Sequence, residues 1–499
     1  MVYTSTRDSS VRVSAAEAIA KGISADGGLF VPMTIPTINL VDIERIARLD
    51  YIGRAKEILR LYLTDFTEDE LTMCVEGAYK AEKFSSPAIA PLYKLNDSAS
   101  ILELWRGPTC AFKDMALQLL PYLLSVSASK TRKNTKIVIL VATSGDTGKA
   151  ALEGFRDVPN TQILVFYPVD GVSPMQKLQM TTQEGANVSV CAIEGNFDDT
   201  QSGVKKIFTN REIEEKFKEH HLAFSSANSI NWGRLVPQIV YYVSAYCDMV
   251  KSGELKLGDP MNVVVPTGNF GNILAAYYAK QMGVPIGKLV CASNANNVLT
   301  DFLTSGTYDK NRPFYCTTSP SMDILISSNL ERLLFLLSGQ DAEQTKKWMT
   351  ELSETGKYTV GEKMQKQLNE LFAAGYCDDE NTKRTIRKIF DEYHYLCDTH
   401  TAVAAAVYDR YQEETGDRTP AVIASTASPF KFARSVMTAI DPGYGEVTWD
   451  DFALVDELSR IANVKVPAAV EELRTAPVLH TAECEKGEME AMVREFLKI

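Results

Sequence analysis

The 499-residue sequence lacks the features that mark exported, disulfide-rich or membrane-spanning proteins. Its nine cysteines are spread singly, with no CxxC pair and an odd total, which argues against a disulfide framework or a zinc site and favours reduced thiols. Residues 1–12 carry polar side chains and both charge signs where a signal segment would be apolar, and no apolar run is long enough to cross a bilayer. We therefore expect a soluble, cytoplasmic protein that does not interact with membranes.

An excess of basic residues is also missing. The 52 Lys and Arg residues are outnumbered by 64 Asp and Glu, and the resulting net charge of −12 argues against a nucleic-acid or anionic-membrane partner for the whole surface. There are only five histidines, and neither HExxH nor GxSxG occurs, so a metalloprotease or a common serine hydrolase has no support and we expect no metal site. The content of 45% hydrophobic and 23% charged residues is that of an ordinary globular protein, and a chain of this length needs two or three domains.

From about residue 136 onwards, apolar β-branched runs alternate with helical patterns. This alternation predicts an α/β fold with mostly parallel sheets flanked by helices. The predicted strands are Lys136–Ala142, Gln162–Tyr167, Asn187–Ile193, Asn262–Val265, Lys288–Ala292 and Ala421–Ser425. The clearest helical periodicities cover Val41–Leu49, Tyr51–Leu63, Asn329–Leu337, Asp341–Leu352, Gly361–Phe372 and Glu488–Ile499.

These patterns suggest a division of the chain into three parts. Residues 1–86 are expected to form a mainly helical N-terminal domain, and residues 87–260 a smaller α/β domain. Residues 261–499 are expected to form a larger α/β domain that carries a helical insertion at about 302–395 and ends in a mainly helical tail. No repeat or low-complexity tract is present, so no linker fixes these boundaries.

One lysine lies in apolar surroundings at a predicted strand-to-helix turn. Lys113 lies in the segment Trp105–Asp114 and has four apolar neighbours, Ala111, Phe112, Met115 and Ala116. Partial desolvation disfavours the ammonium form and favours the neutral amine, which can form a Schiff base. The alternative is an ordinary lysine whose stem lies on an apolar surface with its head in water. Other segments must decide between the two.

Two further turns follow predicted strands and precede predicted helices. In Thr143–Gly148 the backbone N–H groups of the helix start, together with the hydroxyls of Ser144 and Thr147, could bind a phosphate or carboxylate. The alternative is simple helix capping by Ser144 or Asp146. The glycines of Gly268–Asn272 would likewise let the backbone approach an oxyanion, although such short turns are common. Neither turn matches a P-loop or a dinucleotide fingerprint.

Three other segments carry polar groups suited to ligands. Asn228–Arg234 offers amides, a hydroxyl and a guanidinium that could hold a phosphate, or else a helix cap beside a surface arginine. Ser425–Phe432 places Thr426 at the carboxyl end of a predicted strand, where open α/β sheets bind ligands, with a capped turn as the alternative. His400 stands next to a helix start, and a structural histidine is the simpler interpretation.

Taken together and in this order, five segments resemble the threonine synthase family of pyridoxal-phosphate enzymes, which have the tryptophan-synthase β-type fold (fold type II). They are Gly107–Asp114, Thr143–Gly148, Asn228–Arg234, Gly268–Asn272 and Ser425–Phe432. The opening Tyr3–Arg7, the turn Asp26–Pro32, the segment Asp398–Ala402 and the helical insertion, which marks the longer class of the family, extend the resemblance over nearly the whole chain.

The resemblance implies a role for each of these segments. Lys113 would hold pyridoxal 5'-phosphate and move protons during catalysis. The cofactor's phosphate would lie in the turn formed by Gly268, Asn269, Phe270, Gly271 and Asn272, and Thr426 would face its pyridine nitrogen. The amino-acid end of the substrate would meet Ser144, Asp146 and Thr147. Its phosphate would meet Asn228, Ser229 and Arg234, an assignment carried over from a shorter class of the family.

The implied reaction converts O-phospho-L-homoserine and water to L-threonine and phosphate, by γ-elimination followed by β-addition of water. Members of the longer class are often monomeric, so a monomer that acts on a small molecule is expected. Two positions depart from the family pattern, since Arg106 and Ser428 stand where many members have histidine. The alternative functions are a serine or threonine dehydratase on the same fold and a non-catalytic pyridoxal-phosphate-binding protein.

Overall fold

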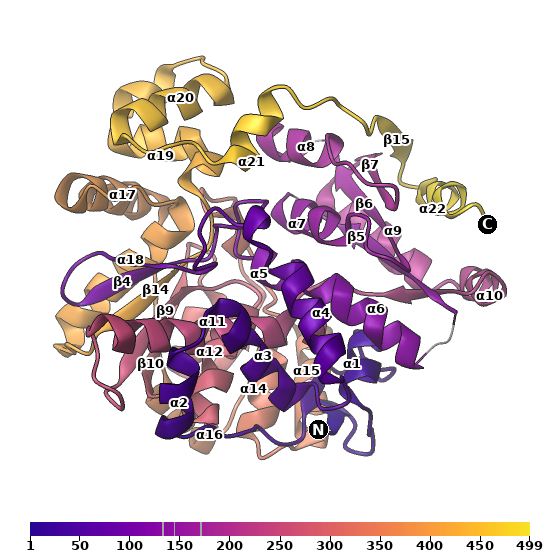
Figure 1. Ribbon diagram of the computed structural model, residues 1–499, viewed down its shortest axis with the longest axis horizontal. Helices are drawn as coiled ribbons and strands as arrows, with labels where there is room; N and C mark the ends of the chain where they lie inside the picture. Colours follow the sequence, from indigo (N-terminus) through magenta and orange to yellow (C-terminus); the bar gives the residue numbers. More distant parts are fainter. Residues whose placement is uncertain (132–133, 144, 170–171) are drawn as a thin grey trace.

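The computed structural model describes residues 1–131, 134–143, 145–169 and 172–499 (Figure 1). Its larger sheet has six strands in the order β13-β10-β9-β14-β4-β3. These are β3 (Leu92–Lys94), β4 (Ala99–Glu103), β9 (Met261–Pro266), β10 (Ile286–Ser293), β13 (Phe372–Tyr376) and β14 (Ala421–Ser425). Only the pairing of β3 with β4 is antiparallel in this sheet, so the carboxyl ends of its other strands share one edge.

A second, fully parallel sheet has five strands in the order β15-β7-β6-β5-β8. These are β5 (Lys136–Ala142), β6 (Thr161–Pro168), β7 (Val188–Glu194), β8 (Leu222–Ser225) and β15 (Ala482–Glu485). In Figure 1 this sheet lies at the upper right and the larger sheet at the lower left.

The predicted α/β class is confirmed, and each of the six predicted strands is present with ends shifted by two residues at most. These strands are apolar on both faces because helices cover both sides of the sheets. Strand β4 was not predicted. Its Ser100 and Glu103 interrupt the apolar pattern, yet both are buried, and Glu103 accepts hydrogen bonds from Arg106 and from the Tyr395 hydroxyl.

The N-terminal region is mainly helical, as predicted, with α1 (Ala15–Lys21), α2 (Leu40–Ala47), α3 (Tyr51–Tyr62) and α4 (Glu68–Ala78). Their starts are fixed by side-chain caps, such as Asp50 on α3 and Thr67 on α4. Strands β1 (Tyr3–Ser5) and β2 (Phe30–Pro32) form a small antiparallel pair.

Further helices follow in the chain. They are α5 (Asp114–Leu117), α6 (Leu120–Thr131), α7 (Asp146–Phe155), α8 (Pro174–Thr181), α9 (Phe197–Phe208), α10 (Arg211–Glu219), α11 (Trp232–Ser252) and α12 (Gly271–Met282). Of these helices, α6, α7, α9 and α10 pack on the smaller sheet, whereas α12 packs on the larger one. Helix α11 is buried over most of its length, and it packs against α3, α5 and α12. A helix that is apolar all round belongs in a core, and α11 lies at the centre of Figure 1.

The insertion contains the predicted helices together with strands that were not predicted. Its helices are α13 (Val298–Ser305), α14 (Leu330–Leu337), α15 (Ala342–Thr355), α16 (Glu362–Leu371) and α17 (Asp379–Tyr393), with a 3₁₀ turn, η2, at Pro320–Met322. Strands β11 (Thr307–Asp309) and β12 (Lys357–Thr359) pair with each other, whereas β13 extends the larger sheet.

After the insertion the chain forms α18 (Thr399–Thr415), β14, the 3₁₀ turn η3 (Pro429–Phe432) and the helical tail. The tail comprises α19 (Ala433–Ile440), α20 (Asp451–Ala462), α21 (Ala468–Glu471), β15 and α22 (Met489–Leu497). Strand pairing crosses the predicted boundary at residue 260 twice, because β4 pairs with β14 and β15 pairs with β7. The three-part division of the chain therefore stays a prediction.

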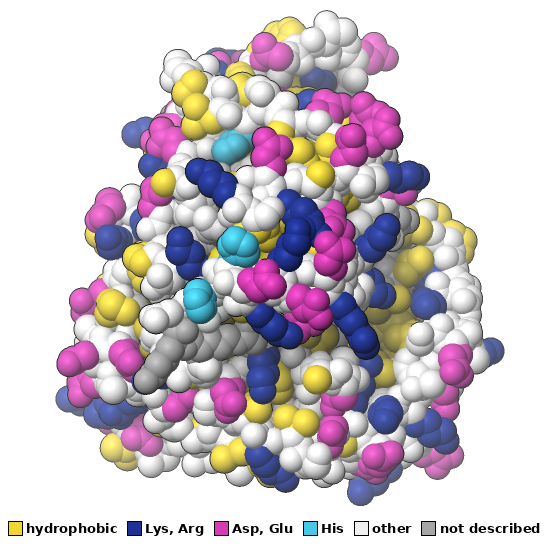
Figure 2. Space-filling view, turned by 90° about the vertical axis from the view of Figure 1, so that its right-hand side faces the viewer, with side chains coloured by type: hydrophobic (Ala, Val, Ile, Leu, Met, Phe, Trp, Pro, Cys, Tyr) yellow, Lys and Arg dark blue, Asp and Glu magenta, His cyan; other side chains and the backbone are white. Residues whose placement is uncertain are grey.

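The surface carries charges of both signs. On the face drawn in Figure 2, Lys and Arg side chains are interspersed with Asp and Glu side chains. Over the described parts of the chain, no helix has the length and apolar character needed to span a bilayer.

Candidate active site

Lys113 follows a tight loop between β4 and α5. The Asp114 carboxylate closes this loop by accepting hydrogen bonds from the Thr109 backbone N–H at 2.8 Å and from its hydroxyl at 2.6 Å. Gly107 is required because a Cβ atom there would lie 2.6 Å from an Asp114 carboxylate oxygen. The loop thus fixes the base of the Lys113 side chain.

The Lys113 amine extends from this loop toward the insertion. Its Nζ lies 3.4 Å from the Ser321 hydroxyl on η2 and 5.5 Å from the centre of the Phe112 ring. Burial lowers the pKa of Lys113 to about 8, although the negative charge of Asp146 acts in the opposite direction. A substantial fraction of the amine is therefore neutral near physiological pH, as the apolar sequence context predicted.

Gly268–Asn272 forms the turn between β9 and α12. Phe270, in the left-handed region at φ 65°, is the N-cap residue, and its side chain makes no capping hydrogen bond. Asn329 holds the turn from the insertion side by donating its backbone N–H (3.0 Å) and side-chain amide (3.1 Å) to the Asn269 carbonyl oxygen. The start of α12 is therefore held in a geometry that could bind an anion.

Asn272 adds a buried donor at the same helix start. The Tyr241 and Tyr242 hydroxyls both donate to its side-chain oxygen, at 2.7 and 2.5 Å. Its Nδ2 is buried and has no hydrogen-bond partner among the described residues. An unpartnered buried donor is costly, so a ligand oxygen is the natural acceptor at this place.

Thr426 is buried directly after β14, at the carboxyl edge of the larger sheet. Its carbonyl oxygen accepts a hydrogen bond from the Phe112 N–H at 2.8 Å, which joins this segment to the lysine loop. The preceding Ser425 hydroxyl accepts from the Trp105 indole at 3.1 Å and from the Thr401 hydroxyl at 2.9 Å. Thr426 and Lys113 are thus held in neighbouring segments.

In the turn after β5, Ser144 lies outside the described residues, and Thr147 is half-buried. Asp146 does not cap α7. Its carboxylate forms a buried ion pair with Lys431 of η3 at 2.6 Å and accepts from Gln176 at 3.2 Å. Burial alone would raise the pKa of Asp146, but the charges of Lys431 and Lys113 hold it well below its usual range. Asp146 is therefore ionised.

Arg234, in the first turn of α11, is a buried cation without a carboxylate partner in the described structure. Its Nη1 donates to the Ala227 carbonyl oxygen at 3.0 Å, and its buried Nε has no partner among the described residues. Burial lowers the pKa of Arg234 to about 10, and its charge in turn lowers that of Lys113. A buried guanidinium in this condition favours an anionic ligand. Asn228 is exposed and Ser229 half-buried just before this helix.

Three residues near the site were not predicted as functional. Lys431 is buried and also donates to the Thr109 carbonyl oxygen at 3.1 Å, so it links the lysine loop to the turn after β5. Ser321 of the insertion contacts the Lys113 amine, and its backbone N–H donates to His400 of α18. Lys431 could have been found from the sequence, because it is a lysine within the apolar run Pro429–Phe432. The residues next to Ser321, in contrast, give no indication of its role.

The two departures from the family pattern have structural roles. Arg106 donates to the Glu103 carboxylate at 2.8 and 2.5 Å, and it lies over the Trp105 ring at 4.3 Å. Ser428 is buried and caps η3. Each side chain therefore braces a loop of the site.

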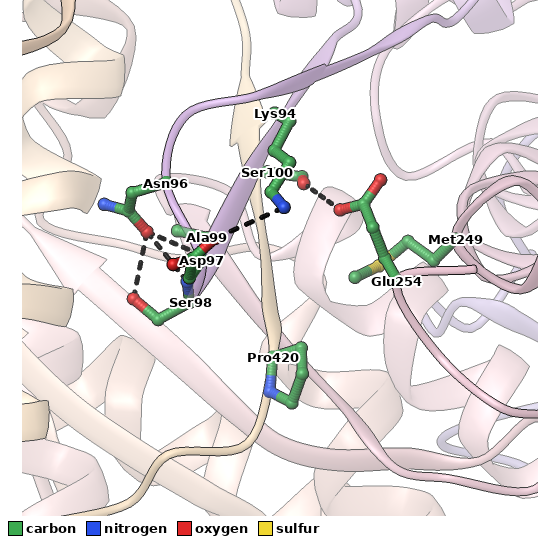
Figure 3. Close-up of a pocket in the computed structure, with 9 residues that line it drawn as sticks. All are labelled: Lys94, Asn96, Asp97, Ser98, Ala99, Ser100, Met249, Glu254 and Pro420. Carbon is green, nitrogen blue, oxygen red and sulfur yellow. Dashed lines mark hydrogen bonds and ion pairs between the residues drawn. The ribbon is translucent and has the colours of Figure 1, made fainter. Parts of the chain in front are cut away.

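A surface pocket elsewhere does not belong to this site (Figure 3). It lies at the amino ends of β4 and β14, where Ala99 and Pro420 line it, and Ser100 donates to Glu254 at 2.7 Å. Lys113 and Thr426 follow the carboxyl ends of the same two strands. The pocket thus opens at the opposite edge of the sheet from the predicted ligand-binding groups.

Comparison with known proteins gives matches along nearly the whole chain. Residues 86–426 match the family described as "Pyridoxal-phosphate dependent enzyme", residues 2–79 match "Threonine synthase N terminus", and residues 401–478 match "Threonine synthase, C-terminal". The structure resembles the "X-Ray crystal structure of PLP bound Threonine synthase from Brucella melitensis" with a TM-score of 0.89 and 34% identity, over 100% of both chains.

Two curated relatives illustrate the range of lengths. "Threonine synthase" of Saccharomyces cerevisiae is 36% identical over 492 residues, which cover 93% of this chain and 94% of the relative. "Threonine synthase-like 1" of Homo sapiens is 40% identical over 434 residues, covering 85% of this chain but only 58% of the relative. The chain thus spans less than two thirds of the length of the relatives with the latter name.

Proposed function

Since the chain belongs to the threonine synthase family of pyridoxal-phosphate-dependent enzymes, we propose that it converts O-phospho-L-homoserine and water to L-threonine and phosphate. The observation that carries the proposal is a pair of separate anion-binding places near one reactive amine. One is the start of α12, and the other is the buried Arg234, whose Nε has no partner among the described residues. A phosphorylated cofactor acting on a phosphorylated substrate needs two such places.

The residues at the first place fit the cofactor. The phosphate would be held by the backbone of Gly268–Asn272 and by the unpartnered Asn272 amide, Lys113 would bind the aldehyde covalently, and Thr426 would face the pyridine nitrogen. When bound, the cofactor withdraws electrons from the substrate carbon next to the amino group and so makes its proton acidic.

Lys113 would act as the base and acid of the reaction. With a pKa of about 8 it can accept a proton from one substrate carbon and return it to a neighbouring one near neutral pH. The fixed negative charge of Asp146 favours the ammonium form that arises in between. Burial lowers the pKa of Lys113 and the charge of Asp146 raises it, and the resulting intermediate value suits a group that must both accept and return a proton.

The substrate would be held at both of its ends. Arg234, with Asn228 and Ser229 at the entrance of α11, would bind the phosphate that leaves from the γ-carbon. The turn after β5, with Ser144, Asp146 and Thr147, would bind the amino-acid end. Because Lys431 already bonds one Asp146 oxygen, Asp146 would contribute to this end mainly as a fixed charge.

The proposal is tested with Lys113→Ala. Wild-type protein should release phosphate from O-phosphohomoserine with an equal amount of threonine, and the variant should lose turnover by about 1,000-fold or more while it remains folded. Borohydride reduction of the wild type, followed by peptide mapping, should fix the cofactor on Lys113.

The matched control is Lys83→Ala. Lys83 is also half-buried and has a pKa lowered by burial, but it donates to Gln118 outside the lysine loop. The Lys83→Ala variant should therefore retain the cofactor absorbance and the turnover of the wild type. Fixation of the cofactor on another lysine, or full activity of Lys113→Ala, would refute the assignment.

The same assays separate the alternatives. A serine or threonine dehydratase would release ammonia from serine or threonine without a need for phosphate. A non-catalytic carrier would bind the cofactor without turnover, but it would have no use for the buried Arg234. We further propose a monomeric, cytoplasmic protein without a nucleic-acid partner, in keeping with the net charge of −12.

A further inference from the structure

His400 and Asp398 form a buried pair at the start of α18. Asp398 caps this helix by accepting the backbone N–H groups of His400 at 2.9 Å and of Thr401 at 3.2 Å. The Asp398 Oδ2 atom also lies 2.7 Å from His400 Nδ1, and both side chains are almost fully buried. Since a carboxylate can only accept, Nδ1 is the donor in this pair, which leaves Nε2 as the ring nitrogen that can accept a hydrogen bond.

The insertion donates a hydrogen bond to the Nε2 atom of His400. His400 Nε2 accepts a hydrogen bond from the Ser321 backbone N–H at 3.2 Å. The histidine ring cannot turn away easily, because it also packs edge-on against Phe432 at 5.1 Å between ring centres. The histidine therefore holds the 3₁₀ turn η2 from the side of the larger sheet.

Ser321 lies between two parts of the proposed site. Its hydroxyl lies 3.4 Å from Lys113 Nζ, and its carbonyl oxygen would lie 2.8 Å from a Cβ atom at position 268. The residue thus touches both the reactive amine and the turn assigned to the cofactor's phosphate. Ser321 is exposed, so a ligand beside Lys113 can reach it.

The other end of η2 is anchored separately. Asp323 accepts from the Asn294 amide and from the Thr317 hydroxyl, both at 2.8 Å. With this end fixed by Asp323, the bond to His400 decides how closely the Ser321 hydroxyl approaches Lys113.

We propose that His400 is a positioning residue that acts on Lys113 through Ser321. The inference rests on the proposed function in one respect, namely that Lys113 is the reactive amine. Whenever this amine is free, the Ser321 hydroxyl accepts its N–H and holds the flexible side chain in one position, ready to act on the substrate. Asp398 maintains the tautomer of His400 that accepts from Ser321.

Kinetics of four variants test the chain of contacts. Ser321→Ala and His400→Phe should each lower kcat about 3- to 10-fold, the effect of one hydrogen bond, with KM within about 2-fold of wild type. Because both changes break the same chain, the double variant should be no slower than the slower single variant. His400→Gln should recover much of kcat, because its amide oxygen can accept from the Ser321 N–H.

A binding measurement supplies a readout independent of turnover. The phosphonate analogue of O-phosphohomoserine, in which carbon replaces the bridging oxygen, should displace Lys113 from the cofactor without reacting further, and the cofactor absorbance reports the displacement. If Ser321 stabilises the freed amine, Ser321→Ala and His400→Phe should each weaken this binding about 3- to 10-fold, without adding together.

Ser328→Ala is the control, since Ser328 lies in the same insertion and its hydroxyl makes no hydrogen bond to the described residues. It should match wild type in both assays. Multiplicative losses in the double variant, or an unchanged kcat and affinity for Ser321→Ala, would overturn the inference.

Failure of the proposed function would look different. Wild-type protein would then neither turn over O-phosphohomoserine nor bind the phosphonate, and L-alanine would serve as the probe that displaces Lys113. The same non-additive loss in alanine binding would support the role of His400, and its absence would refute it.

Discussion

Replacing Lys431 by methionine should destabilise the protein by about 3–5 kcal/mol, the usual cost of leaving a buried charge without its partner. The Lys431 and Asp146 side chains are 1% and 4% exposed, and their charged atoms are 2.6 Å apart. At an effective dielectric constant of about 20 this distance corresponds to an attraction of about 6 kcal/mol. Desolvation of the two ions costs a similar amount, so the pair itself contributes little net stability.

The loss of stability in Lys431→Met arises because the Asp146 carboxylate stays buried without its cation. A second substitution that removes this carboxylate can therefore separate its cost from the cost of losing Lys431 itself. Asp146→Asn combined with Lys431→Met removes both charges and should restore most of the lost stability, leaving a net loss of about 1 kcal/mol from the remaining hydrogen bonds. Urea unfolding curves of the wild type, both single variants and the double variant measure these differences.

The pH dependence gives a second check. In the wild type the pKa of Asp146 is lowered, so its contribution to stability is complete above the unfolded pKa of about 4 and is lost as the pH falls through the lower folded value. In Lys431→Met, the Asp146 carboxyl is buried without its cation, and burial favours its protonated form. The difference in unfolding free energy between this variant and the wild type should therefore narrow as the pH falls toward about 4. A loss below about 1 kcal/mol, or a double variant as unstable as the sum of the two singles, would refute this reasoning.

For the segments of the candidate site that are local in the chain, the sequence predicted the strands and the turns that follow them, while their ligand-binding roles stay a prediction. The turns after β5 and β9 follow strands whose two faces are apolar, and each contains the glycines that a helix start near a ligand requires. The apolar neighbours of Lys113 likewise predicted that the pKa of its amine is lowered. In each case, about ten consecutive residues contain both the pattern that predicts the local structure and the side chains that predict the chemistry.

Contacts between distant segments could not be predicted in the same way. Lys431 meets Asp146 across 285 positions, and Ser321 meets Lys113 across 208. Neither partner is marked by periodicity or spacing, because the pairing depends on how the insertion and η3 pack onto the lysine loop. Strand β4 was missed for a related reason, since its buried Glu103 is satisfied by the distant Tyr395 as well as by Arg106.

Two further predictions concern packing and charge at the lysine loop. Gly154→Ala should destabilise the protein by about 3 kcal/mol in urea unfolding, because the new Cβ would lie 1.9 Å from the Leu117 carbonyl oxygen, where α7 packs on α5. Little change there would mean that the two helices can separate freely. Lys113→Met should instead stabilise the cofactor-free protein. The folded pKa of Lys113, about 8, is below its ordinary value, so the half-buried ammonium lowers stability below pH 8, and this cost fades as the pH rises toward about 10.5. Removing the amine should therefore raise stability by about 1–2 kcal/mol near pH 7 and by less above pH 9. Thermal unfolding across this range measures the difference. A variant that is less stable than wild type at pH 7 would show that contacts of the ammonium, such as the one to Ser321, outweigh its desolvation.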